Sequence, residues 1–151
     1  MNNLYQILDN LRAFLLLNDF TNMVTFGEVS DVDLNKLTNF PLVHITIDRV
    51  TIEENYTDFS LSVIACDIVD VSKELPSDVF LGNNNVQDIL NSQLNVITSV
   101  SNYFRRGDLR DNDFIIVNEA VTATPFLDRF ENQLAGWESD IILRSAMQDK
   151  C

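Results

Sequence analysis

Residues 41–70 constrain the fold more than any other stretch, because they predict two long strands joined by a short polar turn. The first strand covers residues 41–52 and the second covers residues 57–69, with residues 53–56 as the turn. Apolar side chains alternate with polar ones along both strands, which is typical of strands with one face toward a core. The sequence therefore predicts a long β-hairpin.

The apolar alternation changes face within each strand. In the first strand the apolar residues before position 48 lie on one face, and those after position 49 lie on the other. A turn centred on residues 55–56 makes both strands change face at the same height, so this is the register that we expect. It pairs Ile47 with Ile64, Ile45 with Cys66, Val43 with Ile68, Val50 with Leu61 and Ile52 with Phe59.

The tip of the hairpin, residues 48–62, is then a protruding arm whose apolar face is opposite to that of the base. A lone two-stranded tip cannot bury a face by itself, and a soluble protein avoids leaving such a patch exposed. We therefore predict an intersubunit contact at the tip. The competing interpretation is a β-bulge near Asp48 and Arg49, which rotates the tip back onto its own core. The predicted interface residues are Val50, Ile52, Phe59 and Leu61.

The remaining elements predict a single α+β domain that spans residues 1–151. Apolar residues at helical spacing predict one amphipathic helix over residues 3–17 and a longer one that starts after Asn84 or Asn85 and stops at Gly107. The expected architecture is a mostly antiparallel sheet with both helices packed on one face. Further strands are expected at residues 23–29, with a bend at Gly27, at 114–123 and at 137–146, and loops at 30–40, 71–84 and 124–136.

The charge balance limits the partners of the chain. Ten Lys and Arg residues face 23 Asp and Glu residues, for a net charge of -13. Tight binding of nucleic acid requires a cluster of cations that neutralises phosphates, so we do not expect a phosphate-gripping groove. We also expect no membrane contact, because the run of residues 13–17 is too short to span a bilayer.

No residue pattern predicts catalysis, a metal or a cofactor. The sole histidine, His44, has no nucleophile and acid at recognisable spacing, so a hydrogen-bonded strand histidine is the better interpretation. Cys66 and Cys151 are the only cysteines, and zinc requires three or four His or Cys ligands at suitable spacing. Only four glycines are present, and none forms a phosphate-binding loop. We therefore expect a protein that is not an enzyme.

Residues 125–141 carry a resemblance to a known family. The aromatic-rich link and the Leu-Ala-Gly-Trp turn at residues 134–137 resemble the closing segment of small virion proteins of tailed bacteriophages, and the element order resembles the tail-terminator and tail-completion group. The asparagine-rich composition suggests crAss-like phages. The residues that serve as partner contacts or as the turn motif are Phe126, Leu127, Phe130, Gly136 and Trp137.

The resemblance implies a structural protein at the head–tail junction of a virion, assembled in the bacterial cytoplasm. Such proteins form homo-oligomeric rings, expected here to be hexamers, that contact tail-tube and neck or connector proteins. DNA passes through the ring only as cargo, which agrees with the acidic composition. The alternative is a soluble acidic protein-binding module without catalytic activity, which acts on its partner through the hairpin.

Overall fold

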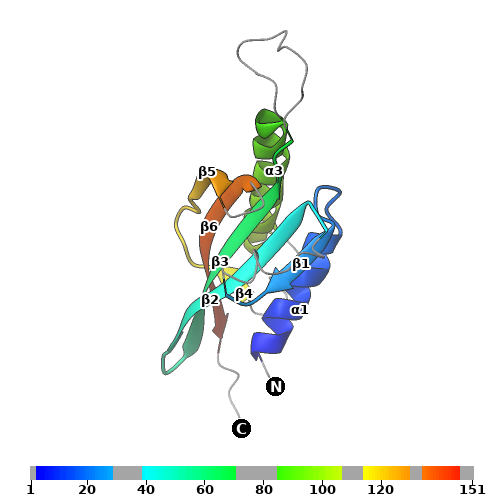
Figure 1. Cartoon of the computed structure of the whole chain (residues 1–151). Coiled ribbons are helices and arrows are strands. Elements are labelled where there is room, and N and C mark those ends of the chain that lie inside the picture. Colours follow the sequence, from blue (N-terminus) through cyan, green and yellow to red (C-terminus); the bar gives the residue numbers. More distant parts are fainter. Residues whose placement is uncertain (1–2, 29–38, 71–84, 107–113, 130–133, 147–151) are drawn as a thin grey trace.

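The computed structural model describes residues 3–28, 39–70, 85–106, 114–129 and 134–146. Within these residues, two helices pack on a mostly antiparallel six-stranded sheet, which confirms the predicted α+β class (Figure 1). Phe130, the expected helix end at Gly107 and most of the expected loops 30–40 and 71–84 lie outside the described residues.

The sheet has the strand order β1-β2-β3-β6-β4, and β5 pairs with the other half of the β6 edge. Only β1 is parallel to its neighbour, and every other pairing is antiparallel. β6 therefore pairs with three strands, with β3 on one side and both β4 and β5 on the other. The strands are β1 (Met23–Phe26), β2 (Leu42–Ile52), β3 (Tyr56–Ile68), β4 (Phe114–Ile116), β5 (Ala123–Arg129) and β6 (Leu134–Ala146).

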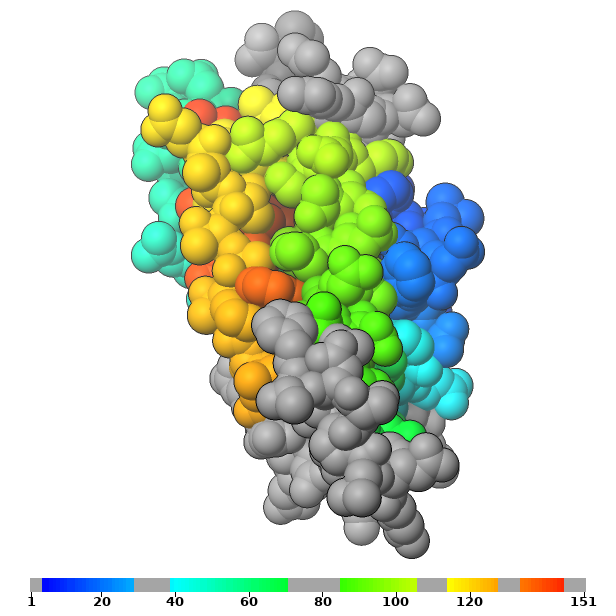
Figure 2. All heavy atoms as spheres, turned by 90° about the horizontal axis from the view of Figure 1, so that it is seen from above, coloured from blue at the N-terminus to red at the C-terminus, as the bar shows by residue number. Residues whose placement is uncertain are grey.

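Both helices, α1 (Asn3–Leu16) and α3 (Val86–Arg106), cover the same face of the sheet. Apolar residues recur at helical spacing along each helix and are buried in one cluster against the sheet, as their periodicity predicts. In the space-filling view, α3 lies between the β4–β5 segment and the N-terminal segment (Figure 2). The buried helical residues are Ile7, Leu11, Leu15, Val96, Ile97, Val100 and Phe104.

The expected register between the first two long strands is wrong. β2 and β3 pair antiparallel, but Ile47 lies opposite Leu61 and Val50 lies opposite Phe59. The register shifts between Ile47 and Arg49, so Asp48 is the extra residue of a β-bulge. The bulge reverses the alternation of β2 once, so Val50, opposite Phe59, points to the same helix-covered face as Val43 and Ile45. The β-bulge of the competing interpretation is therefore present, and Phe59 and Leu61 lie in the core, whereas Val50 and Ile52 are exposed.

The expected two-stranded arm that protrudes alone is not confirmed, because β6 accompanies β3 along its whole length, from Tyr56 to Ile68. Several strand limits also differ from the prediction. β1 ends at Phe26 rather than at residue 29, and β4 ends at Ile116 rather than at residue 123. All of β5 after its first residue lies in the expected loop 124–136, and β6 begins at Leu134 rather than at residue 137. The bend at Gly27 is confirmed by its positive φ of 143°, which favours glycine.

Candidate interaction surface

The four predicted interface residues do not lie on one surface. Phe59 and Leu61 are 6% and 0% exposed and belong to the core beneath the helices, so the prediction that they lie outside the monomer core is wrong. Val50 and Ile52 are 42% and 75% exposed, so they remain available for a partner. The bulge lies in β2, whereas β3 alternates without interruption, so Phe59 and Leu61 share the helix-covered face with Val63 and Ala65. Val50 lies opposite Phe59 on that same face, but in the outer strand of the tip.

The sheet is four strands wide at its tip, and its two middle strands are joined by side chains. Arg144 of β6 donates two hydrogen bonds to the carboxylate of Asp58 on β3, at 2.8 and 3.0 Å. The same guanidinium lies 3.8 Å from the centre of the Tyr56 ring. A bidentate pair combined with ring stacking fixes geometry better than a single ion pair does. The tip is therefore a firmly held part of the sheet.

The outer edge of β2 is covered along only part of its length. β1 pairs with residues Leu42 to Ile45, and next to this pairing the Gly27 N–H donates to the Ile45 carbonyl. Among the described residues, no strand pairs with this edge beyond Ile45. Unpaired strand edges are common sites of strand addition, so the distal part of β2 is a candidate docking edge.

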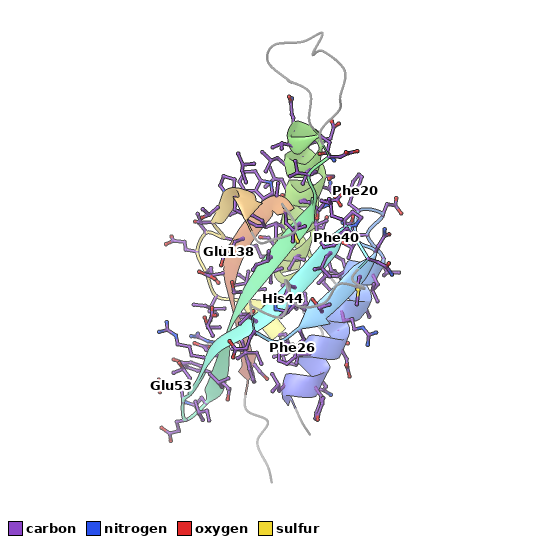
Figure 3. All side chains as sticks on the ribbon, viewed as in Figure 1. Phe20, Phe26, Phe40, His44, Glu53 and Glu138 are labelled. Atoms are coloured by element: carbon purple, nitrogen blue, oxygen red, sulfur yellow. The ribbon has the colours of Figure 1, made fainter. Side chains whose placement is uncertain are left out.

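A second apolar surface follows the end of α1. Leu17 is 82% exposed and Phe20 is 43% exposed, and Leu94 on α3 is 40% exposed. These residues lie close together, because the Gln93 side chain donates to the Phe20 carbonyl and the Asn18 side chain donates to Asn95. Phe20 and the tip residue Glu53 lie at opposite ends of the molecule (Figure 3). Sequence reasoning missed this surface. The signal for it was the run of three leucines at residues 15–17, because a helix that packs on one face cannot bury three consecutive residues.

The C-terminal motif is divided among several environments. Trp137 is partly buried, and its indole N–H donates to the Leu90 carbonyl of α3 at 2.7 Å, so it anchors the sheet to the helix. Gly136 is not in a turn, because it lies within β6 opposite Cys66 of β3. Phe126 packs on a small cluster on the helix-free face of the sheet, and Leu127 is 55% exposed. Phe130 lies outside the described residues.

His44 is a buried structural residue in the strand β2. Its Nε2 donates to the Gly27 carbonyl at 3.3 Å, and its Nδ1 lies 2.7 Å from the Thr25 hydroxyl, which donates to it in this tautomer. These contacts hold β1 and its bend against β2. Nearby Cys66 is fully buried, and burial raises the pKa of its thiol to about 12, with a further contribution from Asp67. A thiol with so high a pKa is not a nucleophile at neutral pH.

An acidic groove lies on the helix-free face of the sheet. Burial raises the pKa of Asp48, and the charges of Asp140 and Glu138 raise it further. Ser62 of β3 donates to a Glu138 carboxylate oxygen on β6 at 3.5 Å. Among the described residues, no group of three or more His, Cys, Asp or Glu residues is placed to hold a metal ion. The groove has a volume of about 440 Å³ and is lined by Asn118, Ala120, Thr122, Thr124, Glu138 and Asp140.

Replacing Asp48 with asparagine is expected to stabilise the protein at neutral pH. A carboxyl group whose pKa is raised in the folded state opposes folding once it ionises, so the penalty is absent at low pH and appears as the pH rises through the folded pKa. Thermal unfolding at pH 7 should show a higher Tm for Asp48→Asn than for the wild type, and this gain should vanish near pH 3. Asp19→Asn, at an exposed position, is the control. An equal gain at both pH values would contradict the electrostatic cause.

None of the described helices is long and apolar enough to cross a membrane. A search against protein-family models gave no match, and neither did a search of curated proteins.

Proposed function

We propose that this chain is a ring-forming structural subunit of a tailed bacteriophage virion, which terminates or completes the tail at the head–tail junction. The observation that carries the proposal is the presence of two separate apolar surfaces at opposite ends of the molecule. One is the distal edge of β2 with Val50 and Ile52, and the other contains Leu17 and Phe20. A ring subunit within a stack needs lateral contacts with its sister subunits and axial contacts with the neighbouring protein.

The separation of the surfaces supports a subunit within a stack, because the distal edge of β2 can serve lateral contacts while the surface at Leu17 and Phe20 serves axial ones. A two-fold contact uses the same surface on both copies, whereas a ring is closed by contacts between two different surfaces. The acidic composition supports the same proposal, since a net charge of -13 lets DNA pass without adhesion. Tail-tube and neck or connector proteins are then the axial partners.

The test is assembly of the full chain in its tail context. We expect mass photometry of the chain with its tail-tube partner to show a discrete oligomer of six copies, and reconstruction of the virion to place a ring at the junction. Ile52→Asp should keep the subunit folded and prevent the oligomer, because it introduces a charge at a 75% exposed apolar position. Gln6→Asp introduces the same carboxylate at an exposed position of α1 outside both surfaces, so it is the matched control and should assemble normally.

Two results would count against this function. A virion that contains one copy or none would exclude the ring, and a monomer that captures a soluble partner through the tip would favour the acidic binding module instead. Tight binding of duplex DNA at physiological salt by the isolated chain would contradict the passive passage of DNA.

A further inference from the structure

The hydrogen-bond pattern at the tip shows which backbone groups of β2 face outward. The Glu53 N–H donates to the Tyr56 carbonyl, which makes these two residues a hydrogen-bonded pair that continues the register of Val50 with Phe59. Hydrogen-bonded and non-hydrogen-bonded pairs alternate in an antiparallel ladder. Thr51 therefore directs its backbone groups toward β3, and Val50 and Ile52 direct theirs away from the sheet.

The same reasoning applies to β4 at the opposite edge. The Val117 N–H donates to the Ile142 carbonyl, in the register that pairs Ile115 with Arg144. Ile115 therefore directs its backbone groups toward β6, whereas Phe114 and Ile116 direct theirs outward. Among the described residues, β4 pairs only with β6, so this outer edge has no strand beside it.

The two outward-facing edges lie at the same height in the sheet. Three successive antiparallel pairings connect β2 to β4, so the two strands run in opposite directions. A second copy displaced sideways would bring its β4 beside β2 as an antiparallel neighbour without any shift in register. The connected rows are Val50–Phe59–Leu143–Ile116 and Ile52–Thr57–Ser145–Phe114.

We propose that the distal edge of β2 pairs with the β4 edge of a second copy, so that one antiparallel sheet continues across the subunit boundary. This proposal rests on the proposed ring and names the lateral contact within it. Val50 would form a hydrogen-bonded pair with Ile116 of the second copy, and Ile52 would pair with its Phe114. Both pairs place apolar side chains side by side on the helix-covered face of the sheet, which extends the core of each subunit.

A two-fold pairing of β2 with β2 is the competing arrangement. It would also make hydrogen bonds between Val50 and Ile52 of the two copies, but it would leave both β4 edges unpaired. The pairing of β2 with β4 satisfies the distal edge of β2 and the edge of β4 in every subunit at once, which is how closed sheets remove the hazard of open edges. We therefore favour the pairing of the two different edges.

Disulfide cross-linking tests this contact directly. Thr51 and Ile115 of the second copy would form a non-hydrogen-bonded pair, with Cα atoms about 4.5 Å apart, which is within the range that a disulfide spans. Thr51→Cys and Ile115→Cys are made as separate chains in a Cys151→Ser background, where Cys66 is buried. Both positions are exposed, so both chains should fold. After oxidation under assembly conditions, the mixed chains should give several-fold more covalent dimer than either chain alone.

The possible outcomes separate this contact from the proposed function. Peptide mapping that joins residues 51 and 115 supports the contact, and Thr51→Cys dimers without the second chain would overturn it in favour of the two-fold pairing. Assembly of a ring without the mixed cross-link would overturn the contact and leave the ring intact. Absence of any assembly by the wild-type chain in its tail context would overturn both.

Discussion

Leu61→Asp is expected to destabilise the isolated protein strongly. Leu61 is fully buried in the cluster between the sheet and the helices, opposite Ile47 on β2 and Ile141 on β6. The substitution removes the packing of a leucine and places a carboxylate in an apolar site, at a cost of roughly 3 kcal/mol or more. Because a domain is stable by only about 5–15 kcal/mol, this loss is a large part of the total.

Ile52→Asp makes the same chemical change on the neighbouring strand and is the matched control. Ile52 is 75% exposed, so its replacement should alter the free energy of unfolding by no more than about 0.5 kcal/mol. Urea denaturation followed by circular dichroism gives both values. We expect a much lower midpoint for Leu61→Asp than for Ile52→Asp. Equal midpoints would mean that Leu61 lies outside the core.

The sequence alone did not separate the environments of Leu61 and Ile52, because the change of face in β2 has two explanations. The apolar pattern of β2 is compatible with two arrangements. In a regular strand, the apolar side chains of the tip point away from the core, whereas in a bulged strand they point to the same face as those of the base. One extra residue, Asp48, converts the first arrangement into the second. The choice depends on packing of Phe59 and Leu61 beneath the helices, and that contact joins residues far apart in the sequence.

Elements with strong local signals were predictable. The long helix α3 begins and ends within about one turn of its predicted limits, because its apolar stripe is continuous over many turns. The strand β5 was missed because Pro125 interrupts its pattern and suggests a loop. Among the residues that the structure describes, β5 pairs with β6 alone. Proline is tolerated on such an edge strand, because its missing N–H can face away from the sheet.

The docking edge of β2 was only partly predictable, because it too depends on contacts between segments far apart in the sequence. Alternation identified Val50 and Ile52 as residues without a place in the core, and both are exposed. The docking edge itself depends on where β1 stops along β2, which is fixed by the turn of the chain at Gly27. The sequence of β2 itself contains no signal for the position at which β1 ends.

Gly136 shows how one residue type can satisfy two different requirements. A glycine before a tryptophan and a polar stretch is typical of a turn, so the sequence favoured a turn there. In the structure Gly136 lies inside β6, between Cys66 of β3 and Phe126 of β5. A Cβ atom at this position would overlap the carbonyl oxygen of Ala65. Glycine is therefore required for close approach of two backbones rather than for its conformational freedom.

Gly136→Ala is accordingly expected to destabilise the protein by about 3 kcal/mol, at the upper end of what overpacking costs. The obstructing atom belongs to the backbone of β3, so it cannot move without disturbing the central pairing of the sheet. Alanine also restricts the unfolded chain, which stabilises a protein by about 0.4–1 kcal/mol where the site accepts it. The steric cost exceeds that gain, so the net effect is a loss.

Ser139→Ala on the same strand calibrates this measurement. It removes one hydrogen bond, from the Ser139 hydroxyl to the Thr122 carbonyl at 3.1 Å, and should cost about 1 kcal/mol. In urea denaturation, Gly136→Ala should therefore have a much lower midpoint concentration than Ser139→Ala, and the two variants should have similar m-values. A Gly136→Ala variant as stable as the wild type would show that β3 and β6 lie farther apart at this position, and Gly136 would then have no role in joining the two strands.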